Sequence, residues 1–277
     1  MDLKLLFQQT FSEWNDHDAP TMGAALAYYT VLSLAPLLVI AVSIAGMVYG
    51  EKAASGEILY QVRGLVGPGG AEVIQSILAN AKSPAKGLLA SAIGILTLLF
   101  GASGVFKALR DSLNRIWGVK AAGRTGVLAT IRHEFSTFGM VLGIGFLLLV
   151  SLVISAVVAM IGKFVHDRAP AGLMQGFNVV LSLIVITLLF ALIYRVVPST
   201  RIHWGDVWVG AFVTAVLFTM GKYLIGLYLG KASVGSAYGA AGSLVALLVW
   251  VYYSAQIFLF GAEFTHVYAK TQGSRRR

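Results

Sequence analysis

The chain has 277 residues, of which 57% are hydrophobic and only 12% charged, and its formal net charge is +9. Globular chains carry about 25% charged residues, so this chain has more apolar surface than a soluble core can bury, and we expect the excess to face lipid. The basic residues lie in short connections and tails, which disfavours a nucleic-acid partner and fits lipid head groups. The absence of cysteine excludes disulfides, thiolate metal sites and cysteine nucleophiles.

Six apolar segments have about the 20 residues that a membrane-spanning helix needs. They cover residues 24–50, 88–106, 138–162, 177–197, 207–229 and 240–268. Because these runs are continuous and do not alternate, they predict helices and not the strands of a membrane barrel. The predicted fold is therefore all-α, a polytopic six-transmembrane-helix bundle with interfacial amphipathic helices, and residues 1–277 form one integral membrane domain.

The Lys and Arg residues of the connections predict the orientation, because cytoplasmic loops carry an excess of both. Thirteen of the 21 lie in the N-terminal tail, the second and fourth connections and the C-terminal tail. Seven lie in the first, third and fifth connections, and Lys222 falls inside the fifth span. Both termini are thus predicted to be cytoplasmic, and the first 19 residues, which include several charged side chains, are not expected to form a cleavable signal.

Two connections contain amphipathic segments. Between the first two spans, apolar residues recur at helical spacing on both sides of Gly67-Pro68-Gly69-Gly70, which predicts a helical hairpin on the outer surface. After the second span, a helix in the inner interface is predicted. Its apolar stripe consists of Phe106, Leu109, Leu113, Ile116 and Trp117. Ordinary packing over the bundle explains both segments as well as a gating or lipid-sensing role does.

Ionisable residues at membrane depth are costly, which makes each of them a candidate for function. Lys222 lies nearer the outer end of the fifth span. With Tyr223, Tyr228 and Ser233 it could bind an anionic group, or its long side chain could snorkel to the outer surface.

On the cytoplasmic side, the sequence predicts one polar cluster near the helix ends. Its members are Glu263, Arg195, Asp206, Arg110 and Asp111. A role in a substrate path is one interpretation, and charge pairing that only fixes the helices is the other.

Proline and glycine positions indicate how the helices bend and pack, and the sequence lacks common enzyme motifs. Pro36 removes a backbone donor within the first span and should kink it, as a hinge or as a fixed bend. Glycines at four-residue spacing, such as Gly46 with Gly50 and Gly226 with Gly230, predict close helix packing. The five histidines lack metal-ligand spacing, and neither a phosphate loop nor a serine elbow is present. We therefore expect no catalytic residues, no metal, no cofactor and no enzyme activity.

The chain resembles the YihY/BrkB family of bacterial inner-membrane proteins along nearly its whole length. The matching motifs are Ala24-Ala25-Leu26-Ala27-Tyr28-Tyr29-Thr30, Ser33 to Leu38, Asp111 to Trp117, Tyr194-Arg195 with Pro198, Tyr238 to Leu244, and Trp250 to Gln256 with Gly261 to Phe264. The resemblance implies six spans in the inner membrane, and some members are associated with movement of lipids or lipopolysaccharide precursors. An older ribonuclease label finds no support in these residues, because a nuclease needs clustered carboxylates or histidines.

The sequence is compatible with three functions. The leading hypothesis is an inner-membrane protein that transports or flips a lipid or a lipid-linked anionic substrate. The first alternative is an ion or small-solute channel or exchanger, in which Glu263 or Asp206 would carry a proton or cation. The second alternative is a non-transporting scaffold of an envelope complex. Membrane lipids are the expected partners, and a homo-oligomer or an envelope protein is compatible with the sequence.

Overall fold

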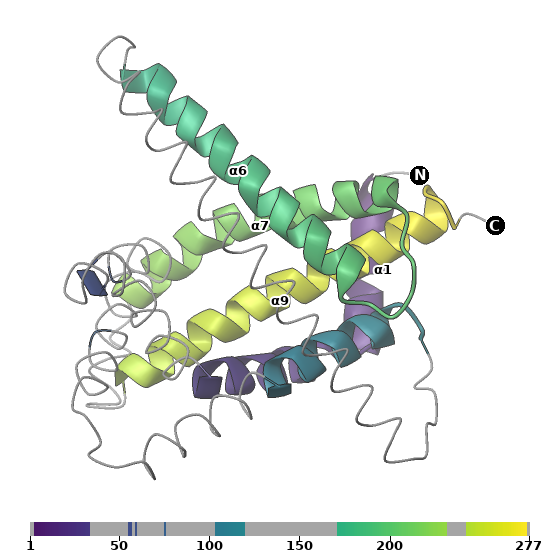
Figure 1. The fold of residues 1–277 in the computed structure, drawn as a ribbon, viewed down its shortest axis with the longest axis horizontal. Helices are drawn as coiled ribbons and strands as arrows, with labels where there is room; N and C mark the ends of the chain where they lie inside the picture. The colour runs from purple at the N-terminus through teal and green to yellow at the C-terminus, as the bar shows by residue number, and fades with distance from the viewer. Residues whose placement is uncertain are drawn as a thin grey trace. The chain divides into compact units, whose positions relative to one another are not determined.

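The computed structural model describes residues 3–33, 55–56, 59, 75, 103–119, 171–231 and 242–275. Every regular element in these ranges is an α-helix, which confirms the all-α prediction (Figure 1). The main helices are α1 (Leu3–Asp16), α6 (Ala171–Val196), α7 (Trp204–Lys231) and α9 (Gly242–Thr271). Two further helical stretches cover residues 19–33 and 103–116.

Helices α6, α7 and α9 coincide with the last three predicted spans. Within the described residues, Trp204–Ile225 and Leu244–Thr271 are long and apolar enough to cross a membrane, and Ser182–Val196 is a shorter apolar helix. At about 1.5 Å per residue, the 22 residues of the first exceed the bilayer core of about 30 Å. Only 33% and 28% of the two apolar windows are buried, whereas a soluble core helix would be mostly buried. The exposed apolar faces of these two helices are therefore suited to contact with lipid.

Several sequence predictions fall outside the described residues. They include the spans at 88–106 and 138–162, most of the span at 24–50 with Pro36, and nearly all of the outer hairpin. The six-span bundle therefore stays a prediction from the sequence, while the helical, apolar character of its last three spans is seen directly.

The chain divides into two compact units. Unit 1 comprises Met1–His17, Arg110–Thr219 and Phe258–Arg277, and unit 2 comprises Asp18–Leu109 and Met220–Ile257. In unit 2, Gln256 Nε2 donates to the carbonyl of Pro20 over 3.4 Å, and Gly23 lies so close to this amide that a β-carbon would overlap it. The acidic, histidine and arginine side chains of the candidate site described below belong to unit 1, and Lys222 belongs to unit 2.

In unit 1, α7 and α9 meet at a seam of paired glycines and threonines. Gly210 of α7 faces Thr265 of α9, and Gly261 of α9 faces Thr214 of α7, with no room for a β-carbon at either glycine. Each threonine hydroxyl donates to the carbonyl of the glycine four residues earlier in its own helix, over 2.7 Å. Small residues at this spacing let helix backbones approach closely.

Tyr194 fixes α6 against this seam. Its ring is buried, its hydroxyl donates to the carbonyl of Phe258 over 2.7 Å, and it lies 3.1 Å from Thr214 Oγ1. Phe190, one turn earlier, contacts Phe218 edge-on at a centroid distance of 5.7 Å. The Tyr194 hydroxyl and the surrounding aromatic rings thereby join α6, α7 and α9 within unit 1.

The amphipathic stretch after the predicted second span is a helix, as expected. Leu113 and Ile116 of its apolar stripe are fully buried and Trp117 nearly so. Gly118 ends the helix with φ +63°, a left-handed conformation that glycine adopts without steric cost, and the amide of Val119 donates back to the carbonyl of Asn114 over 2.8 Å.

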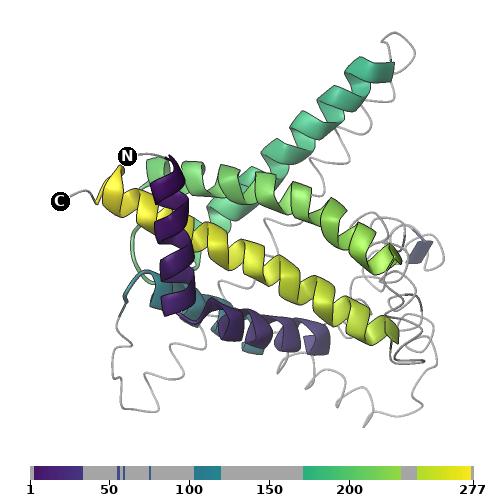
Figure 2. The ribbon, with the colours of Figure 1, turned by 180° about the vertical axis from the view of Figure 1, so that it is seen from behind.

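Helix α1 lies across the C-terminal part of α9 (Figures 1 and 2). Leu6 packs with Phe264 and Val267 of α9, and Phe7 contacts the ring of Phe264 at a centroid distance of 5.4 Å. This apolar contact involves the N-terminal half of α1. The C-terminal, polar end of α1 contacts the same stretch of α9 through Glu263, His266 and Lys270.

Candidate functional site

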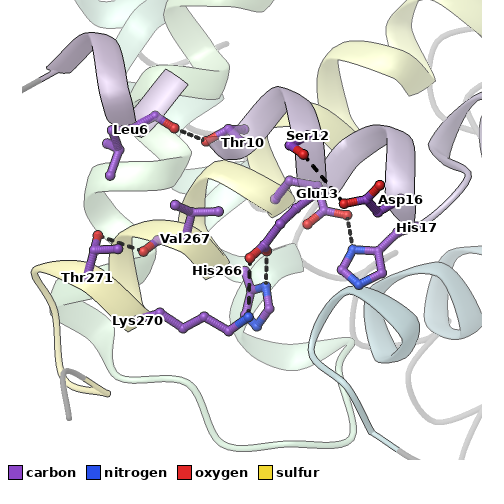
Figure 3. A network of polar contacts seen from close by, with 11 residues as sticks. Leu6, Thr10, Ser12, Glu13, Asp16, His17, His266, Val267, Lys270 and Thr271 are labelled. Carbon is purple, nitrogen blue, oxygen red and sulfur yellow. Dashed lines mark hydrogen bonds and ion pairs between the residues drawn. The ribbon is translucent and has the colours of Figure 1, made fainter. Parts of the chain in front are cut away.

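The polar end of α1 and one face of α9 form a partly buried group of acidic and histidine side chains (Figure 3). We call Glu13, His17, Glu263 and His266 the acid–histidine cluster. Glu13 and His17 are four residues apart, and Glu263 and His266 three, so each pair shares one helix face. The amide of His17 donates to the carbonyl of Glu13 over 2.9 Å, and Asp18 then turns the chain with φ +59°.

Two histidine–carboxylate contacts join the helices. His17 Nδ1 lies 2.7 Å from Glu263 Oε1, and His266 Nδ1 lies 3.0 Å from Glu13 Oε2. Lys270 Nζ lies 3.3 Å from Glu13 Oε1. Since each contact crosses from α1 or its end to α9, the cluster fixes the two helices together.

Burial within the cluster is uneven. The side chain of Glu263 is 0% exposed, against 27% for His17 and 28% for Glu13. Glu263 Oε2 has no hydrogen-bond partner among the described residues. A buried carboxylate oxygen without a partner is costly, so this atom is the least satisfied member of the cluster.

The charge of Glu13 is stabilised by its neighbours. The hydrogen bond from His266 lowers the pKa of the Glu13 carboxyl below its ordinary value of 4.5, against the opposing effect of partial burial, and Lys270 adds to the lowering. Glu13 is therefore an anion at neutral pH.

An aromatic ring and a cavity border the cluster. Trp117 contacts the His266 ring edge-on at a centroid distance of 5.0 Å, and the Arg275 guanidinium lies 4.9 Å from the Trp117 ring. A cavity of about 400 Å³ lies beside Glu13. Its lining residues are Gln9, Ser12, Glu13, Val267, Lys270 and Thr271.

Arginines gather around the connection between α6 and α7, residues 197–203. Arg110 donates to Ser199 Oγ from Nε and Nη2, each over 3.2 Å, and Arg275 Nη2 donates to Thr200 Oγ1 over 3.1 Å. Arg110 Nη1 is buried without a hydrogen-bond partner in the part of the chain that the structure describes. Arg195 lies over the Trp204 ring at 5.8 Å. We call Arg110, Arg195, Arg201 and Arg275 the arginine rim.

Asp206 and Asp111 differ sharply in their surroundings. Asp206 is buried in the first turn of α7, and its carboxylate accepts from the amide of Ser274 over 3.1 Å, so it fastens the chain end after α9. Asp111 is exposed. The five residues predicted as one cytoplasmic cluster thus all lie in unit 1, but in separate contacts: Glu263 with His17, Arg110 with Ser199, and Asp206 with Ser274.

Lys222 belongs to unit 2. Its Nζ lies 5.5 Å from the centroid of the Tyr223 ring, and Tyr223 and Tyr228 are both more than half exposed. Ser233, the other residue predicted beside it, lies outside the described residues.

Three members of the acid–histidine cluster, Glu13, His17 and His266, were missed by sequence reasoning. Each helix presents a glutamate and a histidine three or four residues apart on one face, a spacing that histidine-to-histidine metal motifs do not include. That spacing was visible in the sequence. The meeting of α1 with α9, from opposite ends of the chain, was not.

Comparison with known proteins gives consistent matches. The family described as Virulence factor BrkB matches residues 10–277. A UPF0761 membrane protein of Alteromonas mediterranea is 32% identical over 246 residues, which are 87% of this chain and 79% of that protein. One of Pseudoalteromonas atlantica is 29% identical, covering 95% of this chain and 85% of that protein.

A UPF0761 membrane protein of Alkalilimnicola ehrlichii is also 29% identical, but this chain spans only 56% of its length. No solved structure matches. Because the family match covers nearly the whole chain and these relatives are named membrane proteins, the predicted resemblance is confirmed and the chain belongs to the BrkB family of membrane proteins.

Proposed function

We propose that this protein moves an anionic lipid, or a lipid-linked anionic substrate, across the bacterial inner membrane, with both termini in the cytoplasm. The observation that carries the proposal is the arginine rim. Guanidinium groups gather at the connection between two apolar helices, where a lipid head group would meet the protein. The Lys and Arg distribution of the sequence predicts that this end lies on the cytoplasmic side.

The arginine rim combines charge with membrane-interface aromatic residues. Trp204 and Trp208, in the first turns of α7, are each 44% exposed. Tryptophan is enriched where the bilayer meets water, and arginine binds phosphate with paired N–H donors. Arg110 Nη1 is buried without a partner among the described residues, so rotation of this side chain toward the surface would let the group donate to a phosphate oxygen.

The sides of α6 and α7 supply a surface for acyl chains. The exposed apolar residues of α6 include Val180, Ile184 and Leu188, and Phe212 of α7 is 51% exposed. A head group held at the arginine rim could keep its acyl chains against these helices within the bilayer.

An ion or solute exchanger remains the second candidate, because Glu263 is a fully buried carboxylate inside an apolar helix. Buried acidic residues of this kind act as proton or cation carriers in transporters. The two candidates differ in what crosses the membrane, and under neither is the chain expected to be an enzyme.

The test is leaflet exchange of fluorescent phosphatidylglycerol in liposomes that contain the purified protein, with pH and membrane potential recorded in parallel. We expect exchange above that of protein-free liposomes. Slower exchange in Lys222→Met or in Glu263→Gln would assign that residue, separately, a role in transport. Proton or ion flux without lipid exchange would replace the proposal with the exchanger. Absence of both lipid exchange and ion flux would favour a scaffold.

A further inference from the structure

We infer that Glu13, Glu263 and His266 bind a divalent transition-metal ion between α1 and α9, with His17 positioning the Glu263 carboxylate. One oxygen of each glutamate and one ring nitrogen of His266 lie within 4.8 Å of one another. Metal–ligand bonds of about 2.0–2.2 Å require ligand atoms about 3.4 Å apart, so modest side-chain rotation would close the group around an ion.

The way the ligands are presented resembles known carboxylate metal centres. Glu263-Phe264-Thr265-His266 places a glutamate and a histidine three residues apart on one face of α9. Helical bundles that hold iron or manganese use this spacing, with a further glutamate from a facing helix. Here Glu13 of α1 takes the place of that glutamate.

The two oxygens of Glu263 have different surroundings, which is a second and independent indication. Oε1 is taken by His17 at 2.7 Å, while Oε2 is buried without a hydrogen-bond partner among the described residues. A support that holds one carboxylate oxygen and leaves the other for the ion is the usual arrangement around protein-bound metals. Ion pairing alone satisfies Oε1 but gives no account of Oε2.

The ligand set and the access route limit the choice of ion. Carboxylates suit Mn²⁺ and imidazole suits Zn²⁺ and Fe²⁺, so a mixed set selects first-row ions over Ca²⁺. Two carboxylates match the charge of one divalent ion. The cavity exposes Glu13, one of the three ligands, and Lys270, which is 51% exposed, can move from Glu13 into water.

The test uses the tag-free full chain in detergent, stripped with a chelator and dialysed against Zn²⁺ or Mn²⁺, with bound metal measured by elemental analysis. We expect one ion per chain. Glu263→Gln and His266→Gln should weaken binding by more than about 100-fold, and His17→Gln, which removes only support, by about 10–100-fold. Co²⁺ should give visible absorption bands that the ligand variants lack.

Matched controls and a second variant keep the test decisive. His203→Gln and Asp16→Asn change an exposed histidine and an exposed carboxylate outside the cluster, and both should bind like the wild type. If Glu263→Gln does not fold, Glu13→Gln tests the same site from its half-buried side. Binding of less than one ion by the wild type, or equal binding by the ligand variants, would overturn the inference. Because metal is measured in detergent, the result does not depend on lipid movement.

Discussion

The acid–histidine cluster and the arginine rim both lie in unit 1, yet they differ in how their charges are held. Glu263 is fully enclosed, whereas Arg110 donates to the exposed Ser199 and Arg275 donates to the half-buried Thr200. Glu263 Oε2 and Arg110 Nη1 are both buried without a hydrogen-bond partner in the described part of the chain. Trp117 lies between the regions, contacting His266 and Arg275.

Burial determines what each region can do. Removing a partner from a buried charge costs several kcal/mol, while an exposed pair contributes about 1 kcal/mol or less. We therefore expect substitutions in the cluster to act first on folding, and substitutions in the arginine rim to act on binding with little effect on folding.

His17→Leu should have the largest effect, because it leaves the buried Glu263 carboxylate without its histidine. We expect the free energy of unfolding in chelator-containing detergent to fall by about 3 kcal/mol, the low end for a broken buried pair because the carboxylate can take up a proton. Asn15→Leu, on the exposed side of α1, should stay within about 0.5 kcal/mol of wild type. If the loss is not smaller in a Glu263→Gln background, the pair does not interact as described.

Gly261→Ala tests the seam that holds α9 in place for both regions. The added β-carbon would overlap Thr214 Oγ1 and approach Tyr194 Oη to 2.7 Å. Overpacking of this kind should lower the free energy of unfolding by about 2 kcal/mol. The β-carbon added in Gly56→Ala meets no atom within 4 Å, so this variant should be neutral or more stable than wild type. If Gly261→Ala also leaves the free energy of unfolding unchanged or raises it, α7 and α9 are not closely packed at Gly261.

Tyr194→Phe removes a hydroxyl while keeping the aromatic packing of α6. The lost bond to the carbonyl of Phe258 should cost about 1 kcal/mol in thermal or denaturant unfolding. Tyr228→Phe, at a tyrosine that is 58% exposed, is the matched control. Equal losses of stability in the two variants would mean that the hydrogen bond from the Tyr194 hydroxyl does not stabilise the fold.

The contribution of Glu13 to stability should depend on pH, and this is the smallest effect on stability that we expect. Its pKa is lower in the folded protein than its ordinary 4.5, so the unfolded chain binds the proton first as pH falls. The stabilisation is complete above pH 4.5 and is lost as pH falls through the folded pKa. The melting temperature of wild type should therefore approach that of Glu13→Gln between about pH 5 and pH 3. A constant difference would contradict the assigned contacts.

Prediction from sequence succeeded where a single helix carries the signal. Two of the predicted spans are long apolar helices, a third is a shorter apolar helix, and the buried positions Leu113 and Ile116 follow helical spacing. It failed for the cluster, because Glu13 and His266 are 253 residues apart and their meeting depends on the packing of Leu6 and Phe7 on α9. Likewise, Asp206 has the charge of a path residue, but only the fold shows that it fastens Ser274.

The most direct test of the proposed function is the exchange rate of fluorescent phosphatidylglycerol in liposomes for an Arg110→Gln/Arg275→Gln variant. At about 1 kcal/mol for each arginine near an anionic surface, we expect exchange about 30-fold slower than wild type, with unchanged exchange of a zwitterionic lipid. Arg115→Gln removes an exposed charge five residues after Arg110 and should behave like wild type. Undiminished phosphatidylglycerol exchange in the double variant would contradict the assignment of the arginine rim as the head-group site.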